Sequence, residues 1–64
     1  MIDYAKKIKE YRERNFLTQT DLANLLGVSL ASVTRWETSQ FEPTMKIKKK
    51  LYSLFVEAGM KVEE

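Results

Sequence analysis

The side chains of this chain that could carry chemistry are hydroxyls, amides and charged groups, because its 64 residues include no cysteine and no histidine. Without them there is no imidazole base, no Ser-His pair and no thiolate or imidazole ligand for zinc. We therefore expect no enzyme activity, no catalytic residue, no metal site and no cofactor. What remains is an uncharged run from Leu22 to Thr34, followed directly by one strong cation, Arg35. A surface without carboxylates does not repel phosphates.

The overall charge is a weak indicator, because the net charge is only +2. Its distribution is uneven, since residues 1–50 hold ten of the eleven basic side chains and six of the nine acids. The uncharged run is far shorter than the roughly 20 residues that span a bilayer. The N-terminal residues contain no apolar signal core. We therefore expect a cytoplasmic protein that does not contact the membrane.

Helical periodicity accounts for nearly the whole chain, since it contains one proline and two glycines and shows no β-type alternation. A first helix is predicted to follow Asp3, whose carboxylate can cap it, and to end near Asn15. A second is predicted from Thr18, where Thr18 and Asp21 form a potential capping box, to Gly27. The buried faces of these helices are expected at Tyr4, Ile8, Tyr11, Leu22, Ala23 and Leu26.

A third helix is predicted after the capping residue Ser29, with Val33 and Trp36 facing inward. After a polar loop that ends in Pro43, Thr44 is expected to cap a fourth helix that stops at Gly59. The apolar stripe of the fourth helix comprises Ile47, Leu51, Leu54, Phe55 and Ala58.

The turn between the second and third helices spans only residues 27–29. It is too short for an antiparallel hairpin of long helices and favours a steep crossing of two helices, as in a helix-turn-helix. The predicted fold class is therefore all-α, a compact bundle of four short helices. We expect one domain over residues 1–64, with the helix-turn-helix at about 18–38 and a frayed tail over 60–64.

Several separate segments between Ile8 and Met45 form a known pattern. They are Ile8-Lys9-Glu10-Tyr11-Arg12, Leu17-Thr18-Gln19, Asp21-Leu22-Ala23, Leu26-Gly27-Val28-Ser29, Val33-Thr34-Arg35-Trp36-Glu37 and Pro43-Thr44. With them the chain resembles, without a gap, the XRE or Cro/CI-type (lambda-repressor-like) helix-turn-helix DNA-binding domain. It departs from that family at Phe16 and Ser39, where the family often has glycine, and at Tyr11, where an aliphatic residue is usual. Different loop backbones are expected at residues 16 and 39.

The resemblance implies a bacterial or phage regulator of transcription, most often a repressor, that binds double-stranded DNA sequence-specifically. Its third helix is then expected to enter the major groove, with Leu30 and Ala31 against thymine methyl groups. Arg35 is expected to bind guanine through two hydrogen bonds, or alternatively to grip a phosphate. The full set of residues expected on this groove-facing surface is Ser29, Leu30, Ala31, Ser32, Thr34 and Arg35.

Two further DNA contacts are expected outside the third helix. By resemblance, Gln19 at the start of the second helix contacts a phosphate, and the alternative is an exposed first-turn glutamine. Lys46 is the best candidate for a backbone contact among the lysines of residues 46–50, which could instead form an ordinary solvated face.

The resemblance also implies an ion pair between Arg12 and Glu37 that joins the first helix to the end of the third. The alternative is that both are ordinary surface charges. Tyr52, Val56 and Met60 form a second apolar stripe on the fourth helix, at i, i+4 and i+8. We expect this stripe to serve as the interface of a homodimer on an inverted-repeat operator, although scattered exposed apolar residues are common. Leu25 and Phe41 are further apolar residues without an evident place in the core.

A second function stays open, because a fold does not determine a function. The same scaffold could serve as a protein-interaction module, such as an antitoxin-like protein or a phage-encoded inhibitor. A protein binder more often presents aromatic anchors on its third helix, whereas a DNA reader keeps that surface uncharged or basic. No small-molecule effector is evident from the sequence.

Overall fold

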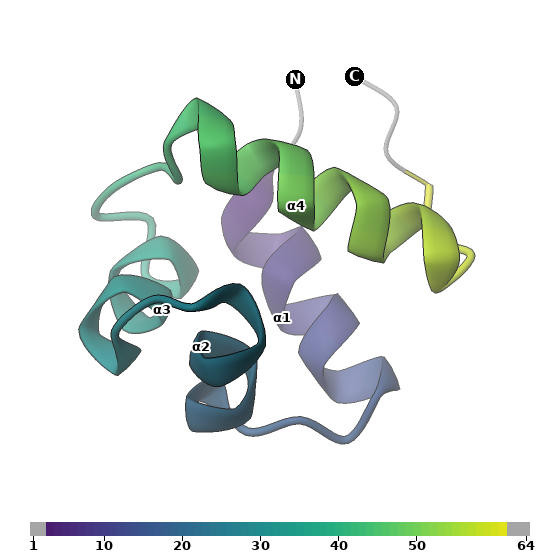
Figure 1. Ribbon diagram of the computed structural model, residues 1–64, viewed down its shortest axis with the longest axis horizontal. Helices are drawn as coiled ribbons and strands as arrows, with labels where there is room; N and C mark the ends of the chain where they lie inside the picture. Colours follow the sequence, from purple (N-terminus) through teal and green to yellow (C-terminus); the bar gives the residue numbers. More distant parts are fainter. Residues whose placement is uncertain (1–2, 62–64) are drawn as a thin grey trace.

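The computed structural model describes residues 3–61, and within this range it contains four α-helices and no strand. They are α1 (Tyr4–Arg14), α2 (Gln19–Leu26), α3 (Leu30–Glu37) and α4 (Met45–Glu57). Helix α1 packs against both α3 and α4, and α2 packs against α3 (Figure 1). The predicted all-α fold class is confirmed.

Three of the four helices begin with the expected side-chain cap. The Asp3 carboxylate accepts a hydrogen bond from the Lys6 amide at 3.2 Å. Thr18 and Asp21 form a reciprocal capping box, with bonds of 2.9 and 3.0 Å between the backbone N–H of each and the side chain of the other. Hydrogen bonds from the Thr18 backbone and then its side chain hold the pKa of Asp21 below its ordinary value. Thr44 occupies the cap position of α4 but makes no side-chain cap hydrogen bond.

All four helices end in the same hydrogen-bond pattern, the Schellman motif. A residue with left-handed backbone follows each helix, and the N–H of the next residue returns to a carbonyl five positions earlier. These bonds between residues five positions apart run from the N–H of Leu17 to the carbonyl of Arg12 at 2.8 Å, from Val28 to Ala23 at 2.9 Å, from Gln40 to Arg35 at 3.0 Å and from Met60 to Phe55 at 2.9 Å. Each helix end is thereby closed by the backbone itself, so the turns that follow have a defined direction.

Two of the four left-handed residues are not glycine. Gly27 and Gly59 have φ of 71° and 73°, while Phe16 and Ser39 have φ of 56° and 62°. The expected change of loop backbone at residues 16 and 39 is therefore wrong. Both turns close in the left-handed conformation that glycine adopts without strain, and these two side chains bear a steric cost there. The left-handed residue after α1 is Phe16, one position beyond Asn15.

The core lies between the inner faces of all four helices. Its buried apolar residues are Ile8, Tyr11, Leu22, Ala23, Leu26, Val33, Trp36, Leu51, Phe55 and Met60. The rings of Tyr11 and Phe55 meet with centroids 6.0 Å apart, which joins α1 to α4. Every core position predicted from the first three helices is present in this cluster or packed against it.

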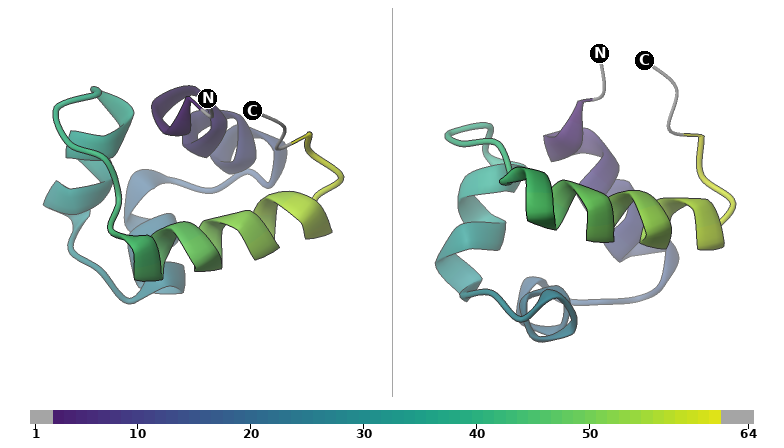
Figure 2. Two further views of the ribbon diagram at one scale, coloured as in Figure 1. Left: turned by 90° about the horizontal axis from the view of Figure 1, so that it is seen from above. Right: turned by 45° about the horizontal axis from the view of Figure 1, so that its top comes forward.

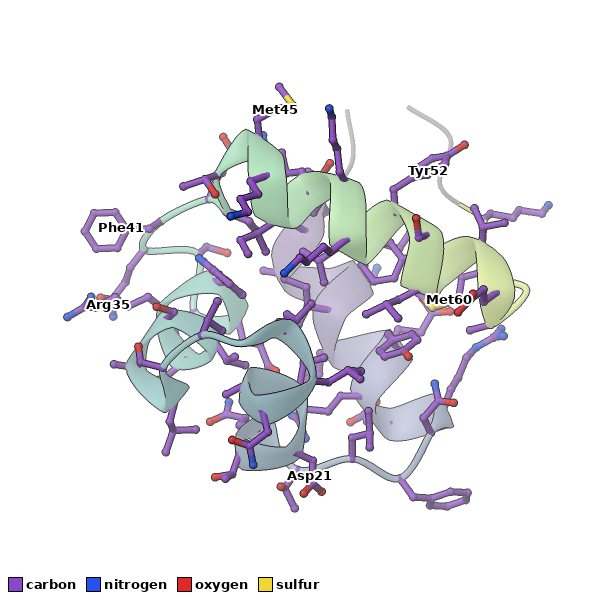
Figure 3. The ribbon with its side chains drawn as sticks, viewed as in Figure 1. Asp21, Arg35, Phe41, Met45, Tyr52 and Met60 are labelled. Carbon is purple, nitrogen blue, oxygen red and sulfur yellow. The ribbon has the colours of Figure 1, made fainter. Side chains whose placement is uncertain are left out.

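Met60 corrects two expectations. Its side chain is only 6% exposed and belongs to the core cluster, and its N–H bonds to the Phe55 carbonyl. Met60 therefore neither frays nor shares the exposed stripe of Tyr52 and Val56. The left-handed turn at Gly59 reverses the chain after α4 and returns Met60 to the interior (Figure 3). Of the tail expected to fray, residues 62–64 lie outside the described residues.

Candidate nucleic-acid interface

The helix-turn-helix is formed by α2, a three-residue turn and α3. The right-hand view of Figure 2 shows α2 end-on and α3 from the side, so their axes cross steeply. Ala23, only 3% exposed, lies on the face of α2 that packs inward, where its small side chain permits close approach. Gly27 makes the turn with its left-handed φ, and the Ser29 hydroxyl caps α3 by accepting from the Ser32 amide at 3.2 Å.

One face of α3 is buried and the other is open. Val33 and Trp36 are in the core, whereas Leu30, Ala31, Thr34 and Arg35 are exposed, Leu30 to 47%. The structure thus brings together on one open face most of the residues predicted there. Ser32 is half-buried, and its hydroxyl lies 3.0 Å from that of Ser29. The two serines are therefore engaged with each other at the start of the helix.

Thr34 is exposed but is already hydrogen-bonded within the protein. Its hydroxyl lies 3.1 Å from the Gln19 side-chain oxygen and 3.1 Å from the Leu30 carbonyl, and it donates toward both. A hydroxyl has a single proton, so these acceptors occupy its donor capacity. Toward any external partner, the Thr34 hydroxyl is therefore left as a hydrogen-bond acceptor.

Arg35 and Phe41 form a pair at the outer edge of this face. The guanidinium carbon of Arg35 lies 5.8 Å from the centroid of the Phe41 ring, within the range of a cation–π interaction. Both side chains are exposed, and Figure 3 shows them projecting from the same side of the molecule. From the sequence, Phe41 is only an apolar residue without an evident place in the core, so this contact is not predicted. The available signal was an aromatic residue in an otherwise polar loop.

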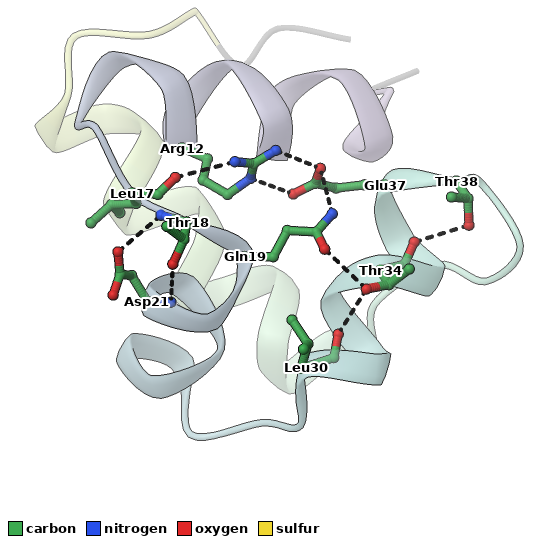
Figure 4. A network of polar contacts seen from close by, with 9 residues as sticks. All are labelled: Arg12, Leu17, Thr18, Gln19, Asp21, Leu30, Thr34, Glu37 and Thr38. Atoms are coloured by element: carbon green, nitrogen blue, oxygen red, sulfur yellow. Dashed lines mark hydrogen bonds and ion pairs between the residues drawn. The ribbon is translucent and has the colours of Figure 1, made fainter.

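An ion pair fixes α3 to α1. The Arg12 guanidinium donates to both carboxylate oxygens of Glu37, at 2.8 and 3.0 Å, and to the Leu17 carbonyl at 3.1 Å (Figure 4). The side chains of Arg12 and Glu37 are 17% and 6% exposed, so they are not ordinary surface charges. The expected ion pair is present, and it also ties down the loop between α1 and α2.

The ionisation of this pair follows from its geometry. Burial on its own raises the pKa of Glu37, but hydrogen bonds from Arg12 and Gln19 and the charge of Arg12 outweigh it, so the pKa lies below the ordinary value. The hydrogen bond to Glu37 raises the pKa of Arg12. Both groups are therefore charged over the physiological pH range.

Gln19 joins the ion pair to the open face of α3. Its amide nitrogen donates to Glu37 at 3.2 Å and its amide oxygen accepts from Thr34 at 3.1 Å. The sequence predicts a phosphate contact for Gln19 but not this bridging position. One N–H of its amide remains for an external acceptor, since the group has two. Gln19 lies at the start of α2, where backbone amides also lack helical partners.

The lysines of α4 differ in their surroundings. Lys46 is exposed in the first turn, directly after the loop that carries Phe41. The Lys48 ammonium lies 3.6 Å from the Glu42 carboxylate and 5.1 Å from the centroid of the Tyr4 ring, so it already has two partners within the protein. Lys49 and Lys50 are exposed.

Several apolar side chains lie outside the core. Tyr52 and Val56 are 53% and 52% exposed, one turn apart on α4, and Leu25 and Phe41 are 54% and 62% exposed. Tyr52 and Val56 thus remain as a short stripe without Met60. Within residues 3–61, no helix is long and apolar enough to cross a membrane. The same range contains no cluster of three or more acidic side chains that could hold a metal ion.

Comparison with known proteins identifies the family. The profile of the helix-turn-helix family matches residues 8–53, which is well over half of the chain. The chain is 38% identical over 58 residues to an uncharacterized HTH-type transcriptional regulator of Methanocaldococcus jannaschii, a match that covers 91% of this chain and 83% of that protein.

A second relative is much longer than this chain. It is named as an HTH-type transcriptional regulatory protein of Pyrococcus abyssi, and it is 36% identical over 56 residues that cover 88% of this chain but 18% of that protein. Both relatives come from archaea, so they give no support to a bacterial or phage source. No solved structure matches the chain significantly. With the matched profile, the two relatives and the four-helix architecture in agreement, the chain belongs to the XRE-type helix-turn-helix family.

Proposed function

We propose that this protein is a sequence-specific regulator of transcription that reads the major groove of double-stranded DNA with α3. One observation carries the proposal: α3 presents an open, acid-free face while its opposite face is fixed by the core and by the pair of Arg12 and Glu37. A reading helix must keep a constant position, because base contacts depend on direction and distance.

Separate roles are proposed for the residues around α3. Leu30 and Ala31 pack on thymine methyl groups, and Arg35 donates two hydrogen bonds to guanine. Gln19 with the first turn of α2, and Lys46 in the first turn of α4, contact phosphates and set the register. Ser29, the N-cap of α3, and Ser32 in its first turn are mainly structural, since their hydroxyls bond to each other.

The protein is further proposed to act as a homodimeric repressor in the cytoplasm. The exposed stripe of Tyr52 and Val56 supports a dimer, because burial of two such side chains against a second copy removes apolar surface from water. A dimer with one α3 per subunit requires half-sites about 34 Å apart, and hence an inverted repeat. Repression is supported by the resemblance to Cro and CI-type proteins.

Selection of bound duplexes from a random pool tests the proposal. We expect enrichment of a short inverted repeat, and an affinity for it whose logarithm falls linearly with the logarithm of salt concentration. Absence of enrichment together with a flat salt response would remove the DNA-binding proposal. It would favour a protein partner, for which the exposed Phe16 and Phe41 are candidate anchors.

A pair of matched variants distinguishes base recognition from contact with the DNA backbone. Arg35→Ala should lose about 1–3 kcal/mol against the preferred base pair and make that one position tolerant of any base. Lys46→Ala should weaken all duplexes about equally and make the salt slope shallower by about one unit. If Arg35→Ala gives the uniform loss instead, Arg35 grips a phosphate and specificity has another source.

A further inference from the structure

We infer that Phe41 is a positioning residue for Arg35: its ring holds the guanidinium in the orientation from which Arg35 reads its base. The inference rests on the proposed function and deepens it, since it assigns a specificity role to the loop between α3 and α4. The contact that carries it is the distance of 5.8 Å between the guanidinium carbon of Arg35 and the centroid of the Phe41 ring.

The backbone fixes the position of Phe41 relative to Arg35. The Gln40 N–H donates to the carbonyl of Arg35 itself at 3.0 Å, and the Ser39 N–H donates to the Trp36 carbonyl at 3.2 Å. These two bonds fold the loop back onto the last turn of α3. Pro43, which is buried, anchors the other end of the loop. The backbone of Gln40, next to Phe41, is therefore bonded to Arg35, the residue whose side chain Phe41 contacts.

A cation–π contact of this kind is compatible with base reading. A guanidinium is planar, and all five of its N–H donors lie in that plane, directed away from its faces. The contact with the ring uses none of these N–H donors in a hydrogen bond, so they remain available for the two acceptors of guanine. No carboxylate contacts Arg35 within the described residues, so no ion pair competes for those donors.

The contact also reduces the conformational entropy that a long side chain loses when it binds a base. A free arginine occupies many rotamers, and ordering it on binding reduces the affinity and the discrimination that it provides. A ring beside the guanidinium narrows that ensemble before DNA arrives. When DNA covers the pair and excludes water, the cation–π attraction itself becomes stronger.

Phe41 has no evident role in the stability of the fold. Its side chain is 62% exposed and lies outside the core cluster. Its variants are therefore expected to fold, which makes it a suitable target. Phe16 provides a matched control, because it is a second exposed phenylalanine, at 94%, located in the loop after α1.

The test uses the duplex that wild-type protein selects from a random pool, and its single-base variants. The measured quantity is the ratio of dissociation constants for the wrong and the preferred base at the position that Arg35→Ala makes tolerant. Phe41→Leu should lower this ratio by about 2- to 5-fold and leave the ratios at other positions unchanged. Phe41→Tyr, which keeps a ring, should retain it, and Phe16→Leu should have no effect. In an Arg35→Ala background, Phe41→Leu should cause no further loss.

A second measurement is independent of DNA. In the free protein, the δ-proton resonances of Arg35 should be displaced by the aromatic ring, and Phe41→Leu should remove that displacement while Phe41→Tyr keeps it. Absence of the displacement in wild-type protein overturns the inference.

The DNA outcomes distinguish the inference from the function on which it rests. If no duplex is selected, the proposed function fails, and the inference fails with it. If Arg35→Ala makes one position tolerant but Phe41→Leu changes nothing, only the inference fails. A uniform loss of affinity in Phe41→Leu also refutes it, because Phe41 is then a general contact to DNA. Loss of binding to a protein partner, with DNA binding intact, identifies Phe41 as an anchor for that partner instead.

Discussion

The ion pair of Arg12 and Glu37 allows a quantitative test of what holds α3 in place. We consider Arg12→Met, Glu37→Met and the double variant, because methionine keeps much of the packing of each aliphatic stem while removing the charge. Arg12→Met deletes three hydrogen bonds, two of them to Glu37. It leaves the 6% exposed carboxylate with the Gln19 amide as its remaining side-chain donor.

The expected magnitude follows from that geometry. Loss of one partner of a buried pair costs about 3–5 kcal/mol, and the lower end applies here because Arg12 is partly solvated and Gln19 still bonds to Glu37. Glu37→Met should cost less, about 2 kcal/mol, since the Arg12 guanidinium keeps the Leu17 carbonyl and reaches water. The double variant should lose about 3 kcal/mol, which corresponds to a coupling energy of about 2 kcal/mol.

The assay is urea unfolding followed by the fluorescence of Trp36, the only tryptophan and a buried one. A chain of this length has a total stability of about 3–10 kcal/mol, so the single variants are measured at low temperature and in added osmolyte. Equal m-values across the four proteins are the control for two-state unfolding. If the losses add to within about 0.5 kcal/mol, the two side chains are not coupled and the ion pair does not hold α3.

Three further predictions concern stability. Because the pKa of Glu37 is lowered in the folded protein, the ion pair contributes its full stabilisation above the ordinary glutamate pKa. This stabilisation is lost as pH falls through the folded-state pKa of Glu37. Glu37→Gln should therefore flatten the acid side of the stability profile measured by denaturation from pH 7 to pH 3. Phe16→Gly and Ser39→Gly should each raise the free energy of unfolding by about 0.5–1 kcal/mol. The relief of left-handed backbone strain exceeds the cost of the added conformational entropy of the unfolded chain. A lowered melting temperature would contradict this. Thr18→Ala should cost about 1 kcal/mol, whereas Thr44→Ala should cost much less because Thr44 makes no cap hydrogen bond, and equal losses in thermal melts would argue against the capping account.

The structure could be predicted from the sequence where it depends on residues that are close together in the chain. Caps and stops depend on residues close together in the chain, and the starts of all four helices and the turn at Gly27 were therefore predictable. The apolar stripes gave most of the core for the same reason. Arg12 and Glu37 lie 25 residues apart, and their contact was expected only through the family resemblance.

The features that were missed depend on the direction of the chain after a turn. Met60 follows Gly59, and only the left-handed turn at Gly59 determines that Met60 enters the core rather than extending the stripe of Tyr52 and Val56. The contact of Phe41 with Arg35 likewise depends on the left-handed Ser39. No periodicity extends through such a turn. The bridge from Gln19 to Thr34 requires the crossing of α2 and α3, which spacing indicates only in outline.

The separation of the two faces of α3 has a consequence for how this protein changes over generations. Leu30 and Ala31 are exposed and their side chains take no part in the polar network, so substitutions there should alter stability by only about 0.5 kcal/mol or less. Under the proposed function, new base preferences can therefore arise at these positions without a compensating change in the core. Thr34 is not free in this sense, because its hydroxyl bonds to Gln19 and through it to Glu37. Substitution of Thr34, unlike substitution of Leu30 or Ala31, therefore also removes a hydrogen bond from this network.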